Sequence, residues 1–260
     1  MQQKKDVIKV FSKNKHKYVT SDTHARGSDL SLIEKWITSE QHATALDIAT
    51  GGGHVARVLS RHCNNVFATD LTRDMLDHTA NYFTDDENVH FMVADAENLP
   101  FIDQSFDIVT CRIAAHHFPH PEKFIKEVYR VLKPQGIFIF IDNIASEHPS
   151  YDIFINTVEK LRDYSHARAL KISEWKQLFA ANNLCISKEF MQKKPLHYKE
   201  WINRTLDCDE EIEFISHLLL NASSHIKRYY QIKTDNEKIL SFAIDEWIVL
   251  SKKEAGTKVI

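Results

Sequence analysis

Residues 44–56 read TALDIATGGGHVA, an apolar run that ends near a carboxylate and passes through three consecutive glycines into a helix-like segment. The whole chain has only six glycines, so three in one turn indicate a place where bare backbone is needed. A strand, a glycine turn and a helix place backbone N–H groups and a helix N-terminus at the carboxyl end of a parallel sheet. Nucleotides bind at that place, and an ordinary tight turn seldom needs three glycines.

Apolar runs and helical patterns alternate on both sides of this turn. The runs cover 44–48, 65–69, 89–93, 107–111 and 136–141, and helices are expected at 28–39, 53–62, 73–84 and 121–133. Continuous apolar strands separated by helices predict a doubly wound α/β fold with a parallel sheet covered on both faces. Later segments are expected to form helices at 151–170 and 173–182, a strand at 184–190, a helical stretch at 197–230 and a last strand at 241–253. Ser173 is the expected N-cap of the second of these helices.

The chain of 260 residues shows no internal repeat and no low-complexity linker, so we expect one domain, 1–260. Within it, the polar residues 1–27 are expected to form an N-terminal lid and residues 28–142 the cofactor-binding core. Residues 143–172 and 195–235 are expected to be helical insertions that cap one sheet, rather than independent domains.

Composition argues against several classes of protein. The 33 basic and 36 acidic residues give a net charge of −3, with no overall field to attract nucleic acid or an anionic membrane. The four cysteines form no CxxC pair, which disfavours a zinc cluster or a disulfide framework and fits a reducing compartment. The N-terminus lacks a signal-peptide h-region, and no apolar run approaches the length of a membrane span. We therefore expect a cytoplasmic protein without a membrane span.

Two classes of nucleotide compete for the glycine turn. GGGHVA satisfies the dinucleotide pattern G-x-G-x-x-[GA], and Asp70 follows the second strand, where a ribose-binding acid is expected. The pattern alone therefore permits NAD and an oxidoreductase. Asp47 argues against NAD because a carboxylate beside the turn would repel a pyrophosphate. The same carboxylate suits S-adenosylmethionine, which carries an ammonium and a sulfonium and has no phosphate.

Four segments in order resemble class I S-adenosylmethionine-dependent methyltransferases, between about residues 44 and 142. ALDIATGGGHVA resembles the family's motif D-x-G-x-G-x-G, which implies that Asp47, Gly51 and Gly53 belong to the cofactor site. Ala49 departs from the motif by replacing its first glycine. FATDLTRDML, VADAENLPF and the segment FDIVTCRIAAHHFPHPEKFIKEVYRVLKPQGIFIFID are similar to the motifs that follow.

The resemblance assigns roles to these residues. Asp70 is implied to hold both ribose hydroxyls, and Leu71 to pack on the adenine. Asp95 is implied to accept from the adenine amino group, and the Ala96 backbone N–H to donate to the ring. The implied fold is a Rossmann-like seven-stranded sheet in the order 3-2-1-4-5-7-6 with strand 7 antiparallel.

The flanks YVTSDTHARGSDL and RDYSHAR resemble the small-molecule branch related to ubiquinone/menaquinone C-methyltransferases. The implied activity is methylation of a small molecule by a monomer or homodimer, with no nucleic acid as partner. A non-catalytic S-adenosylmethionine-binding protein remains the alternative. The acceptor, and whether its carbon, nitrogen or oxygen is methylated, does not follow from the sequence.

His116 and His117 are the best candidates for a general base because histidine titrates near neutrality. They lie in the loop after the fourth strand, and His117 is similar in place to a catalytic histidine of phosphobase methyltransferases. There an N-terminal tyrosine completes a latch, a role open to Tyr18. Methyl transfer needs a base only if the nucleophile must lose a proton, so either histidine could instead be structural. The HHxxH pattern that ends at His120 is weak support for a metal site, and we expect no metal.

Two arginines are candidates for the cofactor's carboxylate, because a guanidinium can donate two hydrogen bonds to it. These are Arg26 and Arg112, and a structural ion pair is the alternative for each. In RDYSHAR, the side chains of Arg162, His166 and Arg168 belong to the insertion expected to cover the site. They could contact substrate or form an ordinary polar helix surface.

Overall fold

The computed structural model describes residues 2–19, 27–37 and 43–254. Its helices are α1 (Gln2–Val19), α3 (Ser28–Ile37), α4 (His54–Ser60), α5 (Arg73–Ala80), the 3₁₀ turn η1 (Ala115–His117), α6 (Pro121–Val131), α7 (Pro149–Arg162), α8 (Ile172–Ala181), α9 (Tyr198–Ile202), α10 (Asp209–Leu220) and α11 (Ser224–Tyr229). Its strands are β1 (Thr44–Ile48), β2 (Asn65–Asp70), β3 (Val89–Val93), β4 (Phe106–Arg112), β5 (Leu132–Ile144), β6 (Leu184–His197), β7 (Lys233–Asp235) and β8 (Lys238–Lys253).

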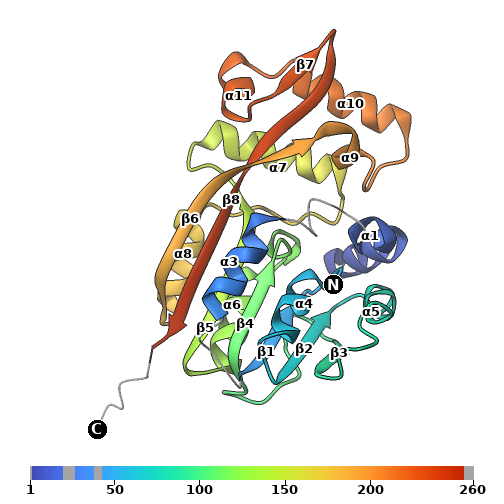
Figure 1. Cartoon of the computed structure of the whole chain (residues 1–260). Helices are drawn as coiled ribbons and strands as arrows, with labels where there is room; N and C mark the ends of the chain where they lie inside the picture. The colour runs from blue at the N-terminus through green and yellow to red at the C-terminus, as the bar shows by residue number, and fades with distance from the viewer. Residues whose placement is uncertain (1, 20–26, 38–42, 255–260) are drawn as a thin grey trace.

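The strands of the described part form one sheet in the order β3-β2-β1-β4-β5-β8-β6 (Figure 1). The first five are parallel, and β8 is antiparallel to both β5 and β6. This confirms the Rossmann-like fold class and its strand order, with β8 in the place of strand 7. The expected count of seven was wrong by one, because the short strand β7 folds back on β8 as a hairpin.

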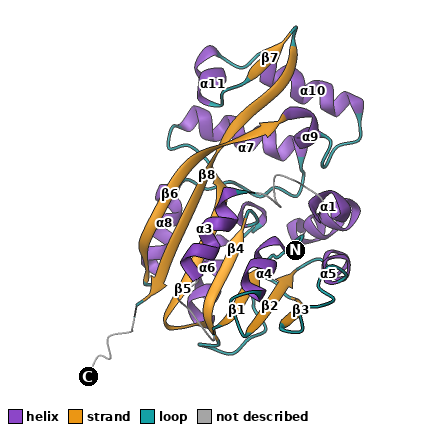
Figure 2. Ribbon diagram, viewed as in Figure 1, coloured by secondary structure: helices purple, strands orange, loops and turns teal. Residues whose placement is uncertain are grey.

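Helices cover both faces of this sheet (Figure 2). The side chains of α3 and α4 pack on one face in a cluster that includes Ala45, Ile108 and Ile139. On the other face, α6 and α8 pack in a cluster that includes Leu46 and Phe138. Because successive strand residues point to opposite faces, a strand buried on both sides must be apolar throughout.

The long strands β6 and β8 continue past the sheet's upper edge and carry a third apolar cluster with α7, α9 and α10 (Figure 1). Trp201, Leu219 and Phe242 are buried at its centre. We call the part of the molecule built around this cluster the cap. It covers the edge of the sheet where the parallel strands end.

The N-terminal segment contains a helix that the sequence analysis did not predict. We placed the first helix after Tyr18, but residues 2–19 form α1 and contain that position. The buried Val10 and Asn14 lie four residues apart, on one face of the helix. A helix that buries only one stripe can be polar elsewhere, so its composition hid it.

Three boundaries in the second half also differ. The expected helix 151–170 ends at Arg162, and the expected stretch 197–230 is broken into α9, α10 and α11. Ser173 is not an N-cap: its backbone N–H and its hydroxyl both donate to Glu147, and the helix begins one residue earlier. Glu174 accepts from the Lys171 N–H at 2.9 Å and satisfies a donor at that terminus. Over the described residues, no helix is long and apolar enough to span a bilayer.

Candidate active site

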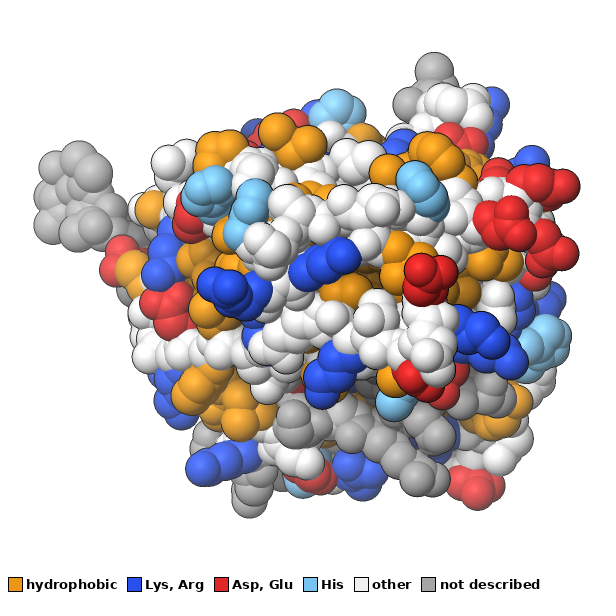
Figure 3. All heavy atoms as spheres, turned by 90° about the horizontal axis from the view of Figure 1, so that it is seen from above, with side chains coloured by type: hydrophobic (Ala, Val, Ile, Leu, Met, Phe, Trp, Pro, Cys, Tyr) orange, Lys and Arg blue, Asp and Glu red, His pale blue; other side chains and the backbone are white. Residues whose placement is uncertain are grey.

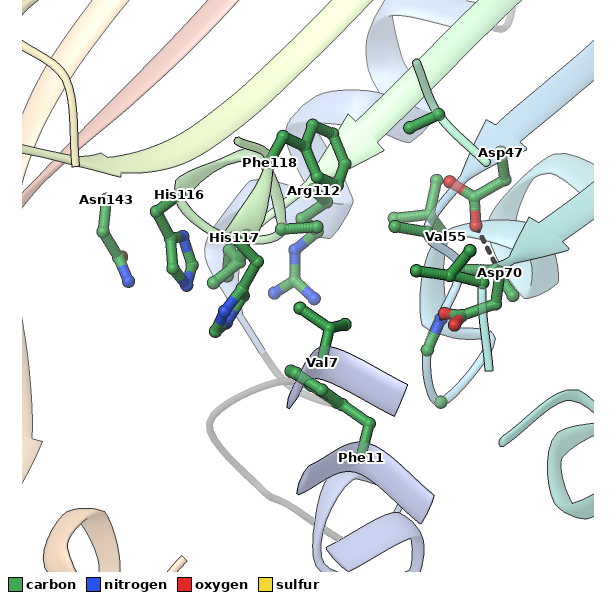
Figure 4. Close-up of a pocket in the computed structure, with 18 of the residues that line it drawn as sticks. Val7, Phe11, Asp47, Val55, Asp70, Arg112, His116, His117, Phe118 and Asn143 are labelled. Atoms are coloured by element: carbon green, nitrogen blue, oxygen red, sulfur yellow. Dashed lines mark hydrogen bonds between the residues drawn. The ribbon is translucent and has the colours of Figure 1, made fainter. Parts of the chain in front are cut away.

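A pocket opens at the carboxyl ends of β1, β2 and β4, between α1 and the cap (Figure 4). Its lining falls into two parts. The first holds residues that the sequence analysis expects to bind the cofactor and is called the cofactor half: Asp47, Ala49, Gly51, Asp70, Leu71, Asp95, Ala96 and Arg112. The second, the acceptor half, includes His116, His117, Asn143, Glu159, Arg162, Lys194, Leu196, Trp201 and Arg204. Figure 4 shows Asp47 and Asp70 on one side of the hollow and the two histidines with Asn143 on the other.

The glycine turn adopts left-handed backbone at alternate positions. Ala49, Gly51 and Gly53 have φ angles of 54°, 52° and 75°. Gly51 lines the pocket, whereas Gly53 supports it from behind. A Cβ on Gly53 would lie 2.6 Å from Thr79 and 2.8 Å from Phe83, so a side chain there would push α4 from α5. Ala49 holds a conformation that glycine adopts without strain, which is the physical reason for glycine in that place of the motif.

Asp47 is held by two threonine hydroxyls. Thr50 donates to one carboxylate oxygen at 2.6 Å and Thr110, from β4, donates to the other at 2.7 Å. The side chain is almost fully buried, at 1% exposed. Burial raises the pKa of Asp47 to about 6, although both hydroxyls and the charge of Arg112 favour the ionised form. An ionised carboxylate in this place is a destabilised charge that a cationic ligand would stabilise.

Asp70 ends β2 and holds the glycine turn from the side. Its carboxylate accepts from the Gly51 N–H at 3.1 Å and from the Thr72 N–H at 2.8 Å. Burial raises the pKa of Asp70, against the effect of these backbone donors. Each oxygen keeps acceptor capacity beyond one backbone bond, so this carboxylate can still receive two hydroxyl groups.

Lys4 of α1 reaches across to the loop after β3. Its ammonium lies 2.6 Å from an oxygen of Asp95 and 2.5 Å from an oxygen of Glu97. The other oxygen of Asp95 accepts from the Glu97 N–H at 3.0 Å. The pKa of Lys4 is raised because these two carboxylates outweigh its partial burial. Ala96 lies beside this ion pair and also lines the pocket.

Arg112 ends β4, and its guanidinium pairs with Asp29 of α3 through two hydrogen bonds, one of them 3.1 Å from Nη2. Both side chains are buried. The alternative of a structural ion pair is therefore realised, while the guanidinium still faces the pocket (Figure 4). Arg26, the other candidate, lies outside the described residues.

His116 sits in η1 and is held by Asp142 at the end of β5. One oxygen of Asp142 lies 2.6 Å from Nδ1 of His116, and the other accepts from the His116 backbone N–H at 2.9 Å. Burial lowers the pKa of His116, but the carboxylate of Asp142 raises it by more, so the net shift is upward. Asp142 was not among the residues singled out from the sequence.

His117 has a different environment although it is the next residue. Its Nδ1 lies 3.0 Å from the backbone oxygen of Ser165 and 3.3 Å from the Ser165 hydroxyl. Burial and the neighbouring His116 lower the pKa of His117 to about 4. The ring of Phe11, from α1, packs edge-on against it with centroids 5.1 Å apart. The side chain of Tyr18, which we expected beside His117, lies outside the described residues.

The acceptor half combines an apolar floor with paired charges from the cap. Arg162 donates to Glu159 from Nη2 at 2.7 Å, and Trp201 donates to the same carboxylate at 3.2 Å. Lys194 lies 2.7 Å from Glu246. The Oδ1 atom of Asn143 is buried and has no hydrogen-bond partner among the residues that the structure describes.

Of the three RDYSHAR candidates, the structure brings two to the site. Arg162 lines the pocket, and His166 packs behind it with its ring centroid 5.6 Å from that of His116. Arg168 points away and pairs with Asp152 and Glu174 at the surface. Among the described residues, no group of three His, Cys, Asp or Glu side chains is placed to hold a metal ion.

Comparisons with known proteins agree with this geometry. A family model described as a methyltransferase domain matches residues 46–140. The chain is 39% identical over 211 residues to the uncharacterized methyltransferase YcgJ of Bacillus subtilis, and the match covers 80% of this chain and 83% of YcgJ. It is 36% identical over 110 residues to the ubiquinone/menaquinone biosynthesis C-methyltransferase UbiE of Rickettsia typhi, covering 39% of this chain and 44% of UbiE. A crystal structure of a Bacillus halodurans methyltransferase superposes with a TM-score of 0.85 at 34% identity, covering 88% of this chain and 100% of that chain.

Proposed function

The chain belongs to the S-adenosylmethionine-dependent methyltransferases, and on that premise we propose that it methylates a small molecule bound in the acceptor half of the pocket. One observation carries the proposal: a single pocket runs from the glycine turn to the inner side chains of the cap. A ligand in the cofactor half and a second molecule under the cap would therefore share one enclosed space. The nicotinamide oxidoreductase considered from the sequence is ruled out by the family.

The cofactor half fits S-adenosylmethionine group by group. We assign Asp70 to the ribose hydroxyls, because its carboxylate faces the pocket and has acceptor capacity left. Asp95 and the Ala96 N–H are assigned to the adenine, with Leu71 packing on the ring. Asp47 supplies the buried negative charge that a sulfonium and an ammonium offset.

Arg112 is assigned to the cofactor's carboxylate, with Asp29 as the residue that aims its guanidinium. A bidentate partner on one edge fixes the plane of the guanidinium and so reduces the entropy lost when it binds a second carboxylate. Arg26 keeps the same role as a prediction from the sequence. The Tyr18 latch to His117 also stays a prediction.

A small acceptor fits this site better than a macromolecule. Trp201 and Leu196 of the acceptor half are buried side chains of the cap, and a nucleotide in a folded RNA or a side chain on a folded protein would have to pass α1 to reach them. Lys and Arg side chains are interspersed with Asp and Glu on the face seen from above, without a continuous basic stripe (Figure 3). Nucleic-acid binding surfaces usually carry such a stripe.

When bound, S-adenosylmethionine supplies an electrophilic methyl group on a positively charged sulfur. The chain's part is to bind, orient and keep water out. Val7 and Phe11 of α1 close the pocket opposite the strand ends with apolar surface (Figure 4). Holding two reactants in line in a dry space can account for much of such a transfer.

A metabolite-library screen tests the proposal. The protein is incubated with S-adenosylmethionine labelled in its methyl group, and products are scored by mass. Parallel incubations contain total RNA or total cell protein in place of metabolites. We expect label in a small molecule and none above background in the macromolecular fractions, with Asp70→Ala as the matched inactive variant. Label only in RNA or protein would refute the small acceptor, and tight cofactor binding without any labelled product would favour a non-catalytic cofactor-binding protein.

A further inference from the structure

The two neighbouring histidines of η1 both line the pocket, but their Nδ1 atoms have different partners. Asp142 accepts at 2.6 Å from Nδ1 of His116, and a carboxylate cannot donate there. Nδ1 of neutral His116 must therefore carry the proton, which leaves a lone pair on Nε2. Asp142 is fixed in turn, because its oxygens also accept from the backbone N–H groups of His116 and Asn143 at 2.9 and 2.8 Å.

The tautomer of His117 follows from a similar argument. The Ser165 hydroxyl donates its hydrogen to Asp163 at 2.6 Å, so toward His117 it can only accept. The Ser165 backbone oxygen also accepts. Nδ1 of His117 must then be the donor, and its Nε2 also carries a lone pair. What differs is the partner: a charged carboxylate behind His116, and a neutral carbonyl and hydroxyl behind His117.

We infer that His116, oriented by Asp142, takes the proton from the nucleophilic atom of the acceptor, and that the acceptor is therefore a hydroxyl or amine that still carries a hydrogen. This inference rests on the proposed function. Asp142 touches no reactant in it and is a positioning residue. His117 packs the site and orders the loop to Ser165.

The step balances in atoms and charge. A lone pair on the acceptor atom X forms the bond to the methyl carbon, and the carbon–sulfur pair stays on sulfur. The X–H proton moves to Nε2 of His116, and its bonding pair stays on X. One positive charge leaves the sulfur and one appears on the imidazolium. Asp142, 2.6 Å away, stabilises that charge, which is an interaction stronger after the transfer than before it.

The surroundings of His116 favour proton uptake. The pKa of His116 is raised although burial alone would lower it, whereas the pKa of His117 is lowered to about 4 and that of His166 is lowered further by burial and by both neighbouring histidines. The groups that face His116 from packed elements are Asp142 on β5, His117 in η1, Glu159 on α7, and Asp163 and His166 in the loop after α7. The three carboxylates all favour imidazolium. A positive charge is therefore better tolerated on His116 than on either neighbour.

Histidine NMR on the intact protein tests the proton's place without an acceptor. We expect neutral His116 to carry its hydrogen on Nδ1 and to titrate above the usual histidine range. Asp142→Asn should lower that pKa by about 1–3 units, the effect of removing an adjacent opposite charge. The matched control, Asp163→Asn, alters the His117 side and should leave the His116 pKa above the usual range. Unchanged titration of His116 in Asp142→Asn, or its hydrogen on Nε2, would overturn the inference.

A second probe checks that Nε2 faces the reacting group. Sinefungin carries an ammonium where the cofactor has its methyl sulfonium, and S-adenosylhomocysteine has neither. We expect sinefungin, compared with S-adenosylhomocysteine, to shift the Nε2 resonance of His116 and to lower its pKa by more than it lowers that of any other histidine. No difference between the two ligands at His116 would place the base elsewhere.

Turnover with the acceptor found in the library screen completes the test. His116→Asn keeps a donor to Asp142 and loses Nε2, and His117→Asn keeps a donor to Ser165, so the two variants are matched. We expect His116→Asn to lower kcat by about 100-fold or more, the scale of general-base catalysis, and to abolish the acidic limb of the kcat/KM profile. His117→Asn should keep that limb. A larger loss of kcat in His117→Asn than in His116→Asn would refute His116 as the base. If the wild-type protein labels no small molecule, the proposed function is refuted instead.

Discussion

The two halves of the pocket are built in different ways. The cofactor half comes from short contiguous segments, in which a strand ends and the next residues turn toward the ligand, as at Asp47 and Asp70. The acceptor half is assembled from η1, α7, α9 and the far end of β6, which lie far apart in the sequence. Its charges are also paired within the cap, as in Arg162 with Glu159, whereas the buried Asp47 is held by the hydroxyls of Thr50 and Thr110. In the proposed function, the residues assigned to the cofactor therefore come from local motifs, whereas those assigned to the acceptor are brought together by the tertiary fold.

The largest expected effect concerns the buried, energetically unfavourable charge of Asp47 in the cofactor half. Because the pKa of Asp47 is raised to about 6 from 3.8, the folded protein holds more protons than the unfolded chain between these pH values. Its contribution to stability therefore falls as the pH rises from about 4 to about 6. Asp47→Asn should raise the free energy of unfolding at pH 7 by up to about 3 kcal/mol, while weakening S-adenosylhomocysteine binding.

Urea unfolding at pH 7 and pH 4.5, with calorimetry for affinity, measures both changes. The stabilisation should shrink at pH 4.5, where Asp47 is protonated in the folded protein. Asp77→Asn, on the exposed face of α5, is the control and should change neither quantity. If Asp47→Asn were less stable than the wild type and bound S-adenosylhomocysteine with unchanged affinity, the Asp47 charge would neither destabilise the fold nor favour ligand binding.

Asp70→Ala addresses the ribose assignment in the same half. Removing charge-assisted hydrogen bonds should weaken S-adenosylmethionine binding by about 2–3 kcal/mol. Titration calorimetry gives the affinity, and the thermal midpoint shows whether the glycine turn survives the loss of the bonds to Gly51 and Thr72. Wild-type affinity in a folded variant would show that the ribose is held elsewhere.

Ala49→Gly tests the strain in the glycine turn. An alanine in the left-handed conformation destabilises the folded protein by about 1–2 kcal/mol, and glycine removes this strain. Glycine also gives the unfolded chain more conformational freedom, which offsets part of the stabilisation. The net expectation is a stabilisation of about 0.5 kcal/mol, read from chemical unfolding. Ala180→Gly in α8, an exposed helical site, should instead destabilise by about 1 kcal/mol. Equal destabilisation by the two changes would mean that the turn at residue 49 is unstrained.

Helix α1 joins the two halves, through Lys4 at Asp95 and Phe11 at His117, and gives the smallest expected effect. We predict that residues 2–19 exchange their amide hydrogens more slowly when S-adenosylhomocysteine is bound, because the ligand adds contacts to a helix held by partly exposed ion pairs. Lys4→Ala should speed exchange in α1 in the free protein. Identical exchange with and without ligand would make α1 fixed structure rather than a lid.

Most residues that line the cofactor half could be named from the sequence because their signals are local. Asp47 and Asp70 stand out as carboxylates at the ends of apolar runs, whereas the strand order and the Asp95–Ala96 loop came from the resemblance to the methyltransferase family. The pairing of Arg112 with Asp29 could not be predicted, since it depends on how α3 docks. Gly53 packs closely against Thr79 and Phe83, and its part in ligand binding stays a prediction from the motif.

The acceptor half was only partly predictable. Asp142 carried the same signal as Asp47, a carboxylate that ends an apolar strand, and could have been found by applying that rule to β5. The stripe formed by Val7, Val10 and Phe11 could have revealed α1. Ser165 and Trp201 carry no such signal, because only the tertiary fold brings Trp201 to the pocket and Ser165 to His117.

Calorimetric titration with S-adenosylhomocysteine and with NAD tests the central claim, that the strand ends form an S-adenosylmethionine site, most directly. We predict one S-adenosylhomocysteine bound per chain, with a matching rise in the thermal midpoint because the ligand binds only the folded protein. NAD should give no heat of binding and no rise. Binding of NAD without binding of S-adenosylhomocysteine would contradict the account.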